Sequence, residues 1–489
     1  MNYLAFDLGG SSGKLFLSEL KNNRLTLTPV HQFKNRPVSM GNGLYWDFIH
    51  IYQELISGIR KAVAQTEDTI DSIGFDSFCN DFALIDETGN LLTPVRCYRD
   101  SRTARCQEHT YSIMSREELY KINGNQSALF NTLLQLDAME TEGQGWLLDN
   151  CYKALFLSDL LIFWLTGKAV TEYTTASVTQ MFDFIKNDWS ETILKNYKIR
   201  KSLFAPLVFP GTVIGRTSDS FNKDLKTKGF FVSSVCHHDT ACAFLSSVCP
   251  RHCAIISCGT WSLVGTETAY PIITEEGFLS NIANEGGYAG HHRLLRNVMG
   301  TWIIQEILHQ LNHSEEAYTY SRLDSEAGNC TTLDCFIDAD AEIFYQPENM
   351  IEKIHSFCME HYQTAPRTTG ELIFCVYASL AFKYRLAIEK LEQITQTPLP
   401  VINIVGGGSQ SSLMCQLTSN ICRRPVAAGP ADASALGNIL VQMIASGTIS
   451  SVSEGRRLIK NSFPVKHYKP DVSSHWEKLY QDFILKFHF

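Results

Sequence analysis

No long hydrophobic run occurs in this sequence, and its absence argues against a membrane-spanning helix. The most apolar stretch, residues 154–165, is interrupted by Ser158 and Asp159, and it falls short of the ~20 apolar residues that a span requires. We expect this stretch to form a buried helix. The N-terminus lacks a basic stretch and places Asp7 inside its first apolar run. We therefore expect no secretory signal, no membrane partner and a cytoplasmic protein.

An excess of basic residues is also absent. The chain has 42 lysines and arginines against 51 aspartates and glutamates, which gives a formal net charge of −9. A nucleic-acid-binding surface needs a basic face, so we predict no nucleic-acid partner. ATP is not excluded, because a few backbone N–H groups can hold a phosphate in an acidic protein.

A disulfide framework is missing as well. The chain has 15 cysteines, an odd number, spread over 489 residues. Since no export signal is predicted, we expect reduced thiols. A chain of this length is too long for one ordinary hydrophobic core, and two domains are expected.

Hydrophobic periodicity predicts an α/β protein. A four-residue spacing of apolar residues predicts a helix over Asp47–Gln65, with Asp47 as its N-cap. The apolar pattern over Gly370–Thr395 predicts a long helix. The pattern over residues 314–366 has too little periodicity to assign helices or strands there. The predicted strands are residues 3–8, 14–20, 24–30, 70–76, 82–85, 253–258, 261–268 and 399–405.

Two glycine-rich segments lie about half a chain apart. Asp7–Lys14 follows an apolar run at 3–6, and Ser257–Ser262 follows another at 254–256. Each pattern predicts a strand, a tight Gly/Ser turn and a second strand. Glycine lets the backbone approach an oxygen closely, and successive N–H groups in such a turn form an anion-binding nest. We therefore predict a duplicated fold that grips a phosphate between its halves.

The first glycine-rich segment is not a Walker A loop. That motif needs a glycine five positions before Gly13, where this chain has Leu8, and Ser or Thr after the lysine. Here Leu15 follows Lys14 and opens a strand. A β-hairpin phosphate loop is the alternative, with the Asp7 carboxylate facing a metal-bound water. An ordinary hairpin with a surface aspartate would give the same pattern.

An acidic residue stands at the end of another predicted strand. The segment Ser234–Ala241 follows a strand-like run at 229–232 and contains Asp239 after two histidines. A carboxylate in this position can accept a proton from a sugar hydroxyl while a γ-phosphate is transferred. A structural aspartate with satisfied hydrogen bonds is the plain alternative.

Zinc is a further interpretation of the same segment, and it would imply a hydrolase. Cys236, His237, His238 and Cys242 all have suitable side chains. Adjacent Cys-His-His side chains point in diverging directions, however, and no second ligand pair follows at the spacing of a zinc finger.

Two more motifs carry weaker signals. Gly406–Gln410 ends a buried strand and leads into a helix near Ser412, which suits a nucleotide lying against backbone or a tight strand-to-helix turn. Tyr98–Arg102 crowds opposite charges after an apolar strand. Such donors and acceptors suit a polyhydroxylated substrate, and a solvated ion-pair cluster is the alternative.

In this order, the motifs resemble the FGGY family of carbohydrate kinases, within the actin/Hsp70/hexokinase superfamily. The resemblance covers essentially the whole chain, and within the family it is strongest to the kinases of L-rhamnulose. It implies an α/β fold with two ribonuclease H-like domains that flank a deep interdomain cleft. Residues 1–245 would form the domain on the sugar side, and residues 246–489 the domain on the nucleotide side. The segments that carry it are Asp7–Lys14, Tyr98–Thr103, His238–Thr240, Gly259–Leu263, Asn284–Gly287, Arg296–Gly300, Trp302 with Gln305, Gly406–Gln410, and Gly429–Ser434.

The resemblance also implies an activity and a site. MgATP would phosphorylate a ketose, foremost L-rhamnulose to L-rhamnulose 1-phosphate, on a monomer or homodimer. Asp239 would be the catalytic base, and Asp7 and Asp239 would hold Mg²⁺ through water. The residues implied for ATP are Gly10, Ser11, Ser12, Gly13, Lys14, Thr260, Gln305 and Gly407. Those implied for the sugar are Cys79, Asp81, His238, Asp239, Thr240 and Asn297.

One departure from the family concerns the loop on the sugar side. Where the family carries Thr-Trp-Gly, this chain has Ser77, Phe78 and Cys79. A tryptophan wall is thus replaced by phenylalanine, and a glycine that lets sugar approach is replaced by cysteine. The identity of the sugar therefore stays open among L-rhamnulose, L-fuculose, L-ribulose and D-xylulose. A non-catalytic sugar-binding sensor on the same fold is the alternative in another class.

Overall fold

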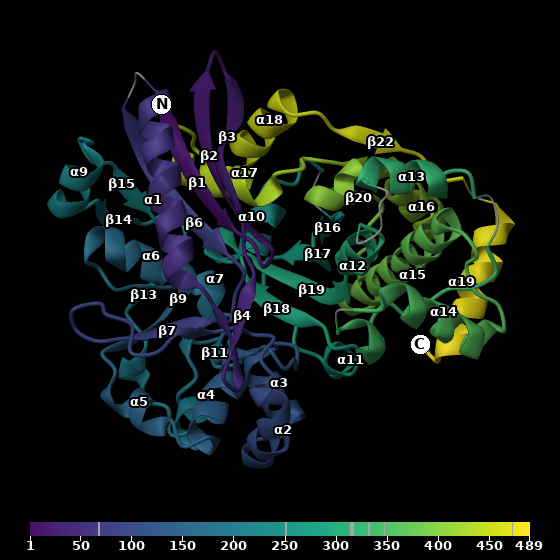
Figure 1. Cartoon of the computed structure of the whole chain (residues 1–489), viewed down its shortest axis with the longest axis horizontal. Coiled ribbons are helices and arrows are strands. Elements are labelled where there is room, and N and C mark those ends of the chain that lie inside the picture. Colours follow the sequence, from purple (N-terminus) through teal and green to yellow (C-terminus); the bar gives the residue numbers. More distant parts are fainter. Residues whose placement is uncertain (67–68, 250–251, 313–316, 331–332, 347, 472) are drawn as a thin grey trace. The chain divides into compact units, whose positions relative to one another are not determined.

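The computed structural model describes residues 1–66, 69–249, 252–312, 317–330, 333–346, 348–471 and 473–489 (Figure 1). The chain divides into two units. Unit 1 comprises Met1–Ser246, Glu267–Leu294 and Ala433–Ser462; unit 2 comprises Ser247–Thr266, Leu295–Asp432 and Phe463–Phe489. The boundary expected between residues 245 and 246 stays a prediction. None of the described helices is both long enough and apolar enough to cross a membrane.

Unit 1 is built on a six-stranded sheet with the order β14-β15-β6-β1-β2-β3. The first two strands form an antiparallel hairpin, while β6 runs parallel to both β1 and β15. The strands predicted in this part of the sequence are confirmed. The strands of unit 1 are β1 (Asn2–Leu8), β2 (Ser12–Lys21), β3 (Arg24–Lys34), β4 (Pro37–Met40), β5 (Gly43–Trp46), β6 (Ile70–Ser77), β7 (Phe82–Ile85), β8 (Val95–Arg96), β9 (Lys153–Phe156), β10 (Thr171–Glu172), β11 (Phe182–Asp183), β12 (Asp188–Trp189), β13 (Leu207–Val208), β14 (Val213–Arg216), β15 (Phe231–Ser233) and β18 (Ala283–Gly286).

Helices cover both faces of this sheet. Leu4 shares a core with Leu55 of α1, whereas the hydroxyl of the neighbouring Tyr3 lies 2.6 Å from that of Thr448, just beyond α17. Because side chains alternate along a strand, those of β1 point to both faces of the sheet and are buried on each. The sequence of β1 is therefore a nearly continuous apolar run. The helices of unit 1 are α1 (Phe48–Gln65), α2 (Arg102–Ile113), α3 (Arg116–Asn123), α4 (Thr132–Thr141), α5 (Gly145–Asn150), α6 (Leu157–Thr166), α7 (Tyr173–Ala176), α8 (Glu191–Asn196), α9 (Asp219–Leu225), α10 (Asp239–Leu245), α11 (Glu275–Leu279), α17 (Ala433–Ala445) and α18 (Val452–Ser462).

Two sequence predictions in unit 1 have different outcomes. The helix expected after Asp47 is confirmed, and the Asp47 carboxylate accepts the backbone N–H of His50 at 3.0 Å as an N-cap. The buried helix expected over residues 154–165 is partly wrong, because the chain enters α6 only at Leu157. The residues before it form β9, which pairs antiparallel with β7. Apolar periodicity alone does not separate a short buried strand from the start of a buried helix.

Unit 2 contains the second strand–turn–strand unit that the sequence predicts. Strand β16 pairs antiparallel with β17 and parallel with β20, which pairs in turn with β21, and β21 pairs with β22. Strand β20 begins at Ile402 rather than at the predicted residue 399, because Pro398 and Pro400 interrupt the ladder. The remaining elements are β16 (Ala254–Cys258), β17 (Trp261–Thr268), β19 (His292–Met299), β20 (Ile402–Val405), β21 (Val426–Ala428), β22 (Lys466–Tyr468), α12 (Trp302–Leu311), α13 (Tyr320–Ala327), α14 (Met350–Tyr362), α15 (Thr369–Thr395), α16 (Ser412–Cys422) and α19 (Ser474–Phe487).

The closest helix crossing in unit 1 depends on a glycine and yields a prediction. A Cβ at Gly437 of α17 would lie 1.8 Å from the carbonyl oxygen of Cys242 in α10, and backbone cannot move aside. We expect Gly437→Ala to lower the free energy of unfolding by about 3 kcal/mol or more, measured by urea denaturation. Gly58→Ala in α1 is the matched control, since its Cβ would meet only side chains, at 3.0 and 3.1 Å. Equal stabilities of the two variants would contradict the packing argument.

Candidate active site

The turn of the first hairpin is fixed by a neighbouring strand end. The N–H of Gly9 donates to the carbonyl of Ser12 at 2.9 Å, which closes the turn. Asn35 follows β3; its amide side chain donates to the Gly9 carbonyl at 2.9 Å, and its backbone N–H donates to the Ser11 carbonyl at 3.0 Å. A side chain at Gly13 would collide with the ring of Phe33, at 2.2 Å. The expected phosphate loop is therefore a rigid, glycine-dependent turn with an exposed tip.

Carboxylates gather where the parallel strands of unit 1 end. Asp7 pairs in register with Asp76 of β6, and Asp239 follows the end of β15 as the first residue of α10. Asp76 is fully buried, and its Oδ2 accepts the side-chain N–H of Asn438 at 2.7 Å. Burial, and then the nearby Asp7, hold the pKa of Asp76 well above its usual range. The sequence predicted roles for Asp7 and Asp239 and missed Asp76 between them.

Asp239 is held from one side by its neighbours in the chain. The backbone N–H of Thr240 donates to its Oδ1 at 2.6 Å, and the Thr240 hydroxyl donates to the same oxygen at 3.2 Å. The Nε2 of His238 lies 3.5 Å from that oxygen, and 28% of the Asp239 side chain is exposed. Burial raises the pKa of Asp239, while His238 and the hydrogen bonds from Thr240 oppose the rise. The result is a partly exposed carboxyl group that binds a proton more readily than an ordinary aspartate does.

A chain of alternating charges continues from Asp239 into the interior. Glu285 Oε2 lies 3.4 Å from the Nδ1 of His238 and 2.9 Å from a guanidinium nitrogen of Arg293, and all three side chains are at least 95% buried. Burial lowers the pKa of His238, but Cys79 and Glu285 outweigh it and raise the pKa to about 10. The imidazole therefore carries a positive charge at neutral pH.

The sugar-side loop is anchored by Asp81. Its Oδ2 accepts the indole N–H of Trp46 at 2.6 Å and the backbone N–H of Tyr98 at 2.9 Å, and its Oδ1 accepts the amide of Gln135 at 3.0 Å. The ring of Phe78 lies 4.7 Å from that of Trp46 and 5.8 Å from that of Tyr98, between ring centres. Asp81 thus positions an aromatic cluster, and burial raises its pKa to about 7.

In unit 2, Thr260 and Gln305 are linked through one residue. Thr301 donates both its backbone N–H and its hydroxyl to the carbonyl of Gly259, at 2.8 and 2.7 Å. The amide of Gln305 donates to the Thr301 hydroxyl at 3.1 Å, and the backbone N–H of Trp302 donates to the Thr260 carbonyl at 3.3 Å. The second hairpin turn and the start of α12 are therefore joined.

The other two residues expected in unit 2 have different surroundings. A Cβ at Gly407 would meet no atom within 4 Å, so this glycine borders open space at the end of β20. The side-chain oxygen of Asn297 in β19 is buried and has no hydrogen-bond partner among the described residues. An orphaned buried oxygen of this kind is suited to receive a ligand donor.

The zinc interpretation of residues 236–242 finds no support in the arrangement. The thiol of Cys242 donates to the backbone carbonyl of Cys236 at 3.0 Å, and the Nδ1 of His237 lies 2.8 Å from Asp159 in a fully buried pair. Among the described residues, the group of His, Cys, Asp and Glu side chains close enough to share a metal is elsewhere, at Cys335, Cys358 and Cys375.

The predicted site residues thus fall into two sets. Unit 1 holds Asp7, Gly10, Ser11, Ser12, Gly13, Lys14, Cys79, Asp81, His238, Asp239 and Thr240, and unit 2 holds Thr260, Asn297, Gln305 and Gly407. Sequence reasoning assigned no role to Asp76, Glu285, Arg293 or Asn438. Asp76 could have been found, because it ends a predicted strand just as Asp7 does. Glu285 lies in the segment Asn284–Gly287, which carries the family resemblance but was given no role, whereas Arg293 and Asn438 gave no local signal.

Family models match both halves of the chain. Residues 2–246 match the N-terminal domain of the FGGY family of carbohydrate kinases, and residues 254–446 match its C-terminal domain. The chain is 38% identical to a rhamnulokinase from Ligilactobacillus salivarius, over 99% of both chains. It is 35% identical to a rhamnulokinase from Bacteroides thetaiotaomicron, over 99% of this chain and 98% of that one.

Solved structures show the same fold at lower identity. A ligand-bound xylulose kinase from Lactobacillus acidophilus matches with a TM-score of 0.81 and 17% identity, over 99% of this chain and 97% of that chain. A glycerol kinase from Plasmodium falciparum with ADP matches with a TM-score of 0.78 and 15% identity, over 100% and 97%. The two-domain kinase fold expected from the sequence is therefore confirmed.

The charge on His238 provides a prediction that is independent of activity. Removing the anion of Glu285 should lower the pKa of His238 from about 10, because a nearby negative charge favours the imidazolium. An NMR titration of the His238 imidazole in the Glu285→Gln variant would measure this lower pKa. Glu267→Gln, which removes the ion-pair partner of Arg456, is the control. If Glu285→Gln titrates like the wild type, Glu285 does not hold the charge on His238.

Proposed function

Because the chain belongs to the FGGY family of carbohydrate kinases, we propose that it transfers the γ-phosphate of ATP to L-rhamnulose, giving L-rhamnulose 1-phosphate. The observation that carries this proposal is the similarity to rhamnulokinases at 35–38% identity over nearly the whole chain.

Asp239 is the base of the proposed reaction. The Oδ1 of Asp239 faces the backbone N–H and hydroxyl of Thr240 and the imidazole of His238. The other oxygen, Oδ2, is left to accept the proton of the sugar hydroxyl. A raised pKa favours this role, because a general base is most effective when its pKa lies near the working pH. As the hydroxyl oxygen forms its bond to phosphorus, its proton moves to Asp239 and ADP leaves.

His238 supports the base and does not replace it. The raised pKa of His238 favours the imidazolium form, which has no lone pair with which to take another proton. Its positive charge opposes the rise that burial causes in the pKa of Asp239, and its position beside the base allows a hydrogen bond to the sugar. Glu285 and Arg293 hold the ring from behind, which fixes its orientation.

The two hairpin turns are proposed to bind the phosphates of ATP. Gly10, Ser11, Ser12, Gly13 and Lys14 offer backbone N–H groups, hydroxyls and a cation at the tip of the first hairpin. In unit 2, the hydroxyl of Thr260 and the amide of Gln305 serve the nucleotide, and Gly407 leaves room beside the backbone. Asn297 is assigned to the sugar, on the strength of its orphaned side-chain oxygen.

The carboxylates of unit 1 fit a magnesium ion. The pKa of Asp76 is raised by burial and by the charges of Asp7 and Asp239, so a cation would relieve repulsion among the three. Mg²⁺ prefers carboxylate oxygens and keeps several waters. We assign Asp7 and Asp239 to Mg²⁺ through water and add Asp76 behind them. When bound, the ion neutralises charge on the phosphate oxygens.

The proposed sugar site is bordered by the aromatic cluster of Phe78, Trp46 and Tyr98. In this chain a tryptophan stacks behind the phenylalanine that replaces the family's tryptophan, so an aromatic wall is preserved. Cys79 is half-buried next to His238, and loss of hydration raises the pKa of its thiol, which favours the neutral form. A neutral, compact thiol leaves the site suited to an uncharged sugar.

The first test is the release of ADP from MgATP with a panel of ketoses. We expect turnover with L-rhamnulose at a kcat/KM at least tenfold above that with L-fuculose, L-ribulose or D-xylulose. Faster turnover of another ketose would retain the kinase and move its specificity. If no ketose is phosphorylated while sugar still binds, the sensor interpretation replaces the enzyme.

The role of Asp239 is tested by Asp239→Asn. We expect kcat to fall by about 10²–10⁴ with little change in the affinity for ATP, because the amide cannot accept the proton. Asp219→Asn on the exposed start of α9 is the matched control and should leave kcat unchanged. An Asp239→Asn enzyme within threefold of the wild type would overturn the assignment.

A further inference from the structure

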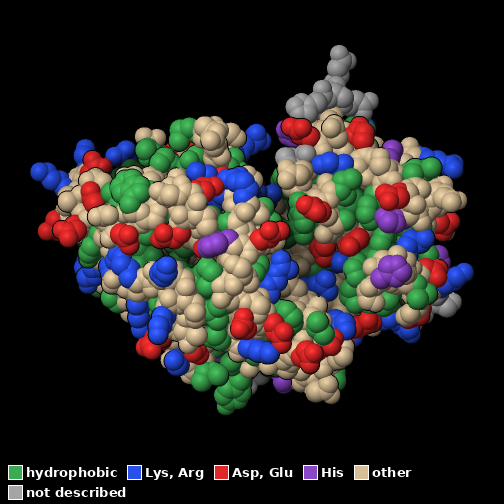
Figure 2. Space-filling view, turned by 90° about the horizontal axis from the view of Figure 1, so that it is seen from below, with side chains coloured by type: hydrophobic (Ala, Val, Ile, Leu, Met, Phe, Trp, Pro, Cys, Tyr) green, Lys and Arg blue, Asp and Glu red, His purple; other side chains and the backbone are tan. Residues whose placement is uncertain are grey.

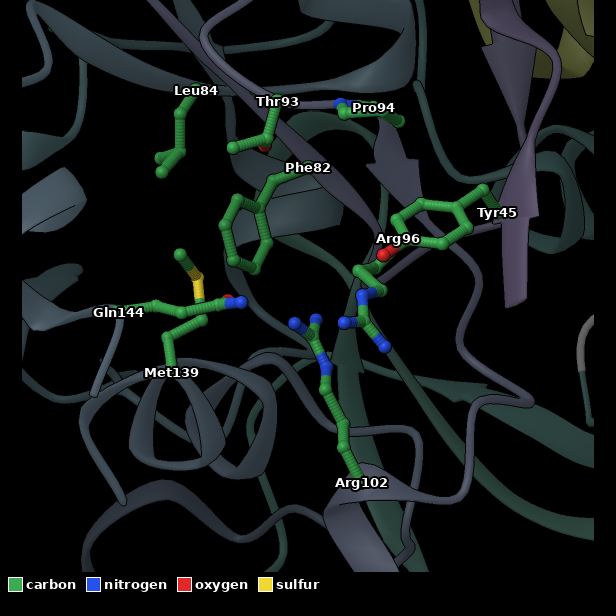
Figure 3. A pocket seen from close by; sticks show the side chains of 9 residues that line it. All are labelled: Tyr45, Phe82, Leu84, Thr93, Pro94, Arg96, Arg102, Met139 and Gln144. Carbon is green, nitrogen blue, oxygen red and sulfur yellow. The ribbon is translucent and has the colours of Figure 1, made fainter. Parts of the chain in front are cut away.

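A cavity of unit 1 outside the proposed site brings two arginines together. Its volume is about 110 Å³, well above the roughly 10–15 Å³ that a single water needs by the same measure. Arg96 of β8 and Arg102 at the start of α2 line it, and their guanidinium groups lie next to each other in Figure 3. The amide of Gln144 points toward them from the opposite wall. The cavity is therefore lined by three groups that donate hydrogen bonds.

The charges of the two arginines are unequally compensated. Arg96 forms an ion pair with Asp100 at 2.8 Å. Arg102 is 2% exposed, yet none of the described carboxylates pairs with its guanidinium, and its Nε has no hydrogen-bond partner. A side-chain hydrogen bond holds it, from Nη2 to the amide oxygen of Gln135 at 3.1 Å. Burial, and then the charge of Arg96, lower the pKa of Arg102.

A buried cation without an ion-pair contact is costly, and the carboxylates of Asp100, Asp81 and Glu142 offset the charge of Arg102 only in part. Asp100 does not pair with the Arg102 guanidinium. Its oxygens already accept hydrogen bonds from the backbone N–H groups of Leu44 and Arg102 and from the Arg96 guanidinium. The remaining space beside both guanidinium groups is the cavity itself. An anion in the cavity would accept hydrogen bonds from two forked donors, the arrangement that matches phosphate and carboxylate oxygens best.

We propose that this cavity binds a small phosphate, either free or as the phosphate group of a small ester, between Arg96 and Arg102. The amide of Gln144 donates a further hydrogen bond to it. The wall opposite the arginines is apolar, with Phe82 of β7 and Met139 of α4 (Figure 3). The carbon body of an ester faces this wall, and a free phosphate leaves room there for water.

The site is distinct from the proposed catalytic centre. Gln135 stands between the two, since its oxygen accepts from Arg102 and its amide nitrogen donates to Asp81. Gln135 does not line the cavity, so a phosphate there reaches Arg102 without contacting the carboxylate of Asp81. The proposal does not depend on turnover, and a loss of kinase activity would leave it untouched.

The test measures the binding of inorganic phosphate and of fructose 1-phosphate to the full-length protein by calorimetry at constant ionic strength. Gln144→Glu places a carboxylate in the cavity, where it pairs with the arginines. We expect it to weaken binding of the preferred phosphate at least tenfold. Gln53→Glu adds the same charge on the exposed face of α1 and serves as control. Arg102→Gln should weaken phosphate binding by at least the same factor as Gln144→Glu. If Arg102→Gln does not fold, the result with Gln144→Glu decides the outcome.

Each outcome is decisive. Tighter binding of fructose 1-phosphate identifies a phosphate ester as the ligand, and tighter binding of inorganic phosphate identifies the free ion. The glycine-rich hairpins also offer N–H groups to phosphate, so the comparison between variants carries the result. If Gln144→Glu binds both probes as Gln53→Glu does, or if the wild type binds neither, the proposal is overturned.

Discussion

The cost of burying carboxylates at one edge of a sheet is the constraint that the rest of unit 1 depends on. Asp76 and Asp239 both lose hydration there, and burial is the largest cause of the raised pKa of each. Each group is stabilised by donors of its own, from Asn438 in one case and from Thr240 and His238 in the other. These donors fix helices α10 and α17 against the ends of the strands.

Charge alternation determines which group can take a proton. Moving inward from the surface, Asp239 is followed by a protonated His238, then by Glu285 and Arg293. Glu285 faces both His238 and Arg293, and a guanidinium nitrogen of Arg293 also lies 3.2 Å from the Nδ1 of His238, so one carboxylate offsets the charge of both neighbours. Because the imidazole is already protonated, the carboxylate is the only basic group of this series that faces the exposed end. The assignment of the base therefore depends on residues that never touch the substrate.

Local chemistry explains which features the sequence could predict. The hairpin turns follow from glycines and from alternation over a few residues, and the N-cap of α1 follows from Asp47 alone. Asp76 ends a predicted strand and could have been found, whereas its partner Asn438 lies 362 positions away and could not. Residues 154–156 were predicted as helix and pair as strand β9, since only the distant partner strand decides between the two. The assignment of single residues to ATP or sugar stays a prediction.

Gln135 shows how one neutral side chain can connect two charged ones. Its nitrogen faces the carboxylate of Asp81 and its oxygen faces the guanidinium of Arg102, so turning the amide over would break both hydrogen bonds. Arg102 also lowers the pKa of Asp81, which burial raises to about 7. An anion beside Arg102 would offset that positive charge and raise the pKa of Asp81 further. The ionised form of Asp81 is the stronger acceptor for the indole N–H of Trp46. Occupation of the cavity and the anchoring of the aromatic cluster are thus electrostatically linked, without any movement of the backbone.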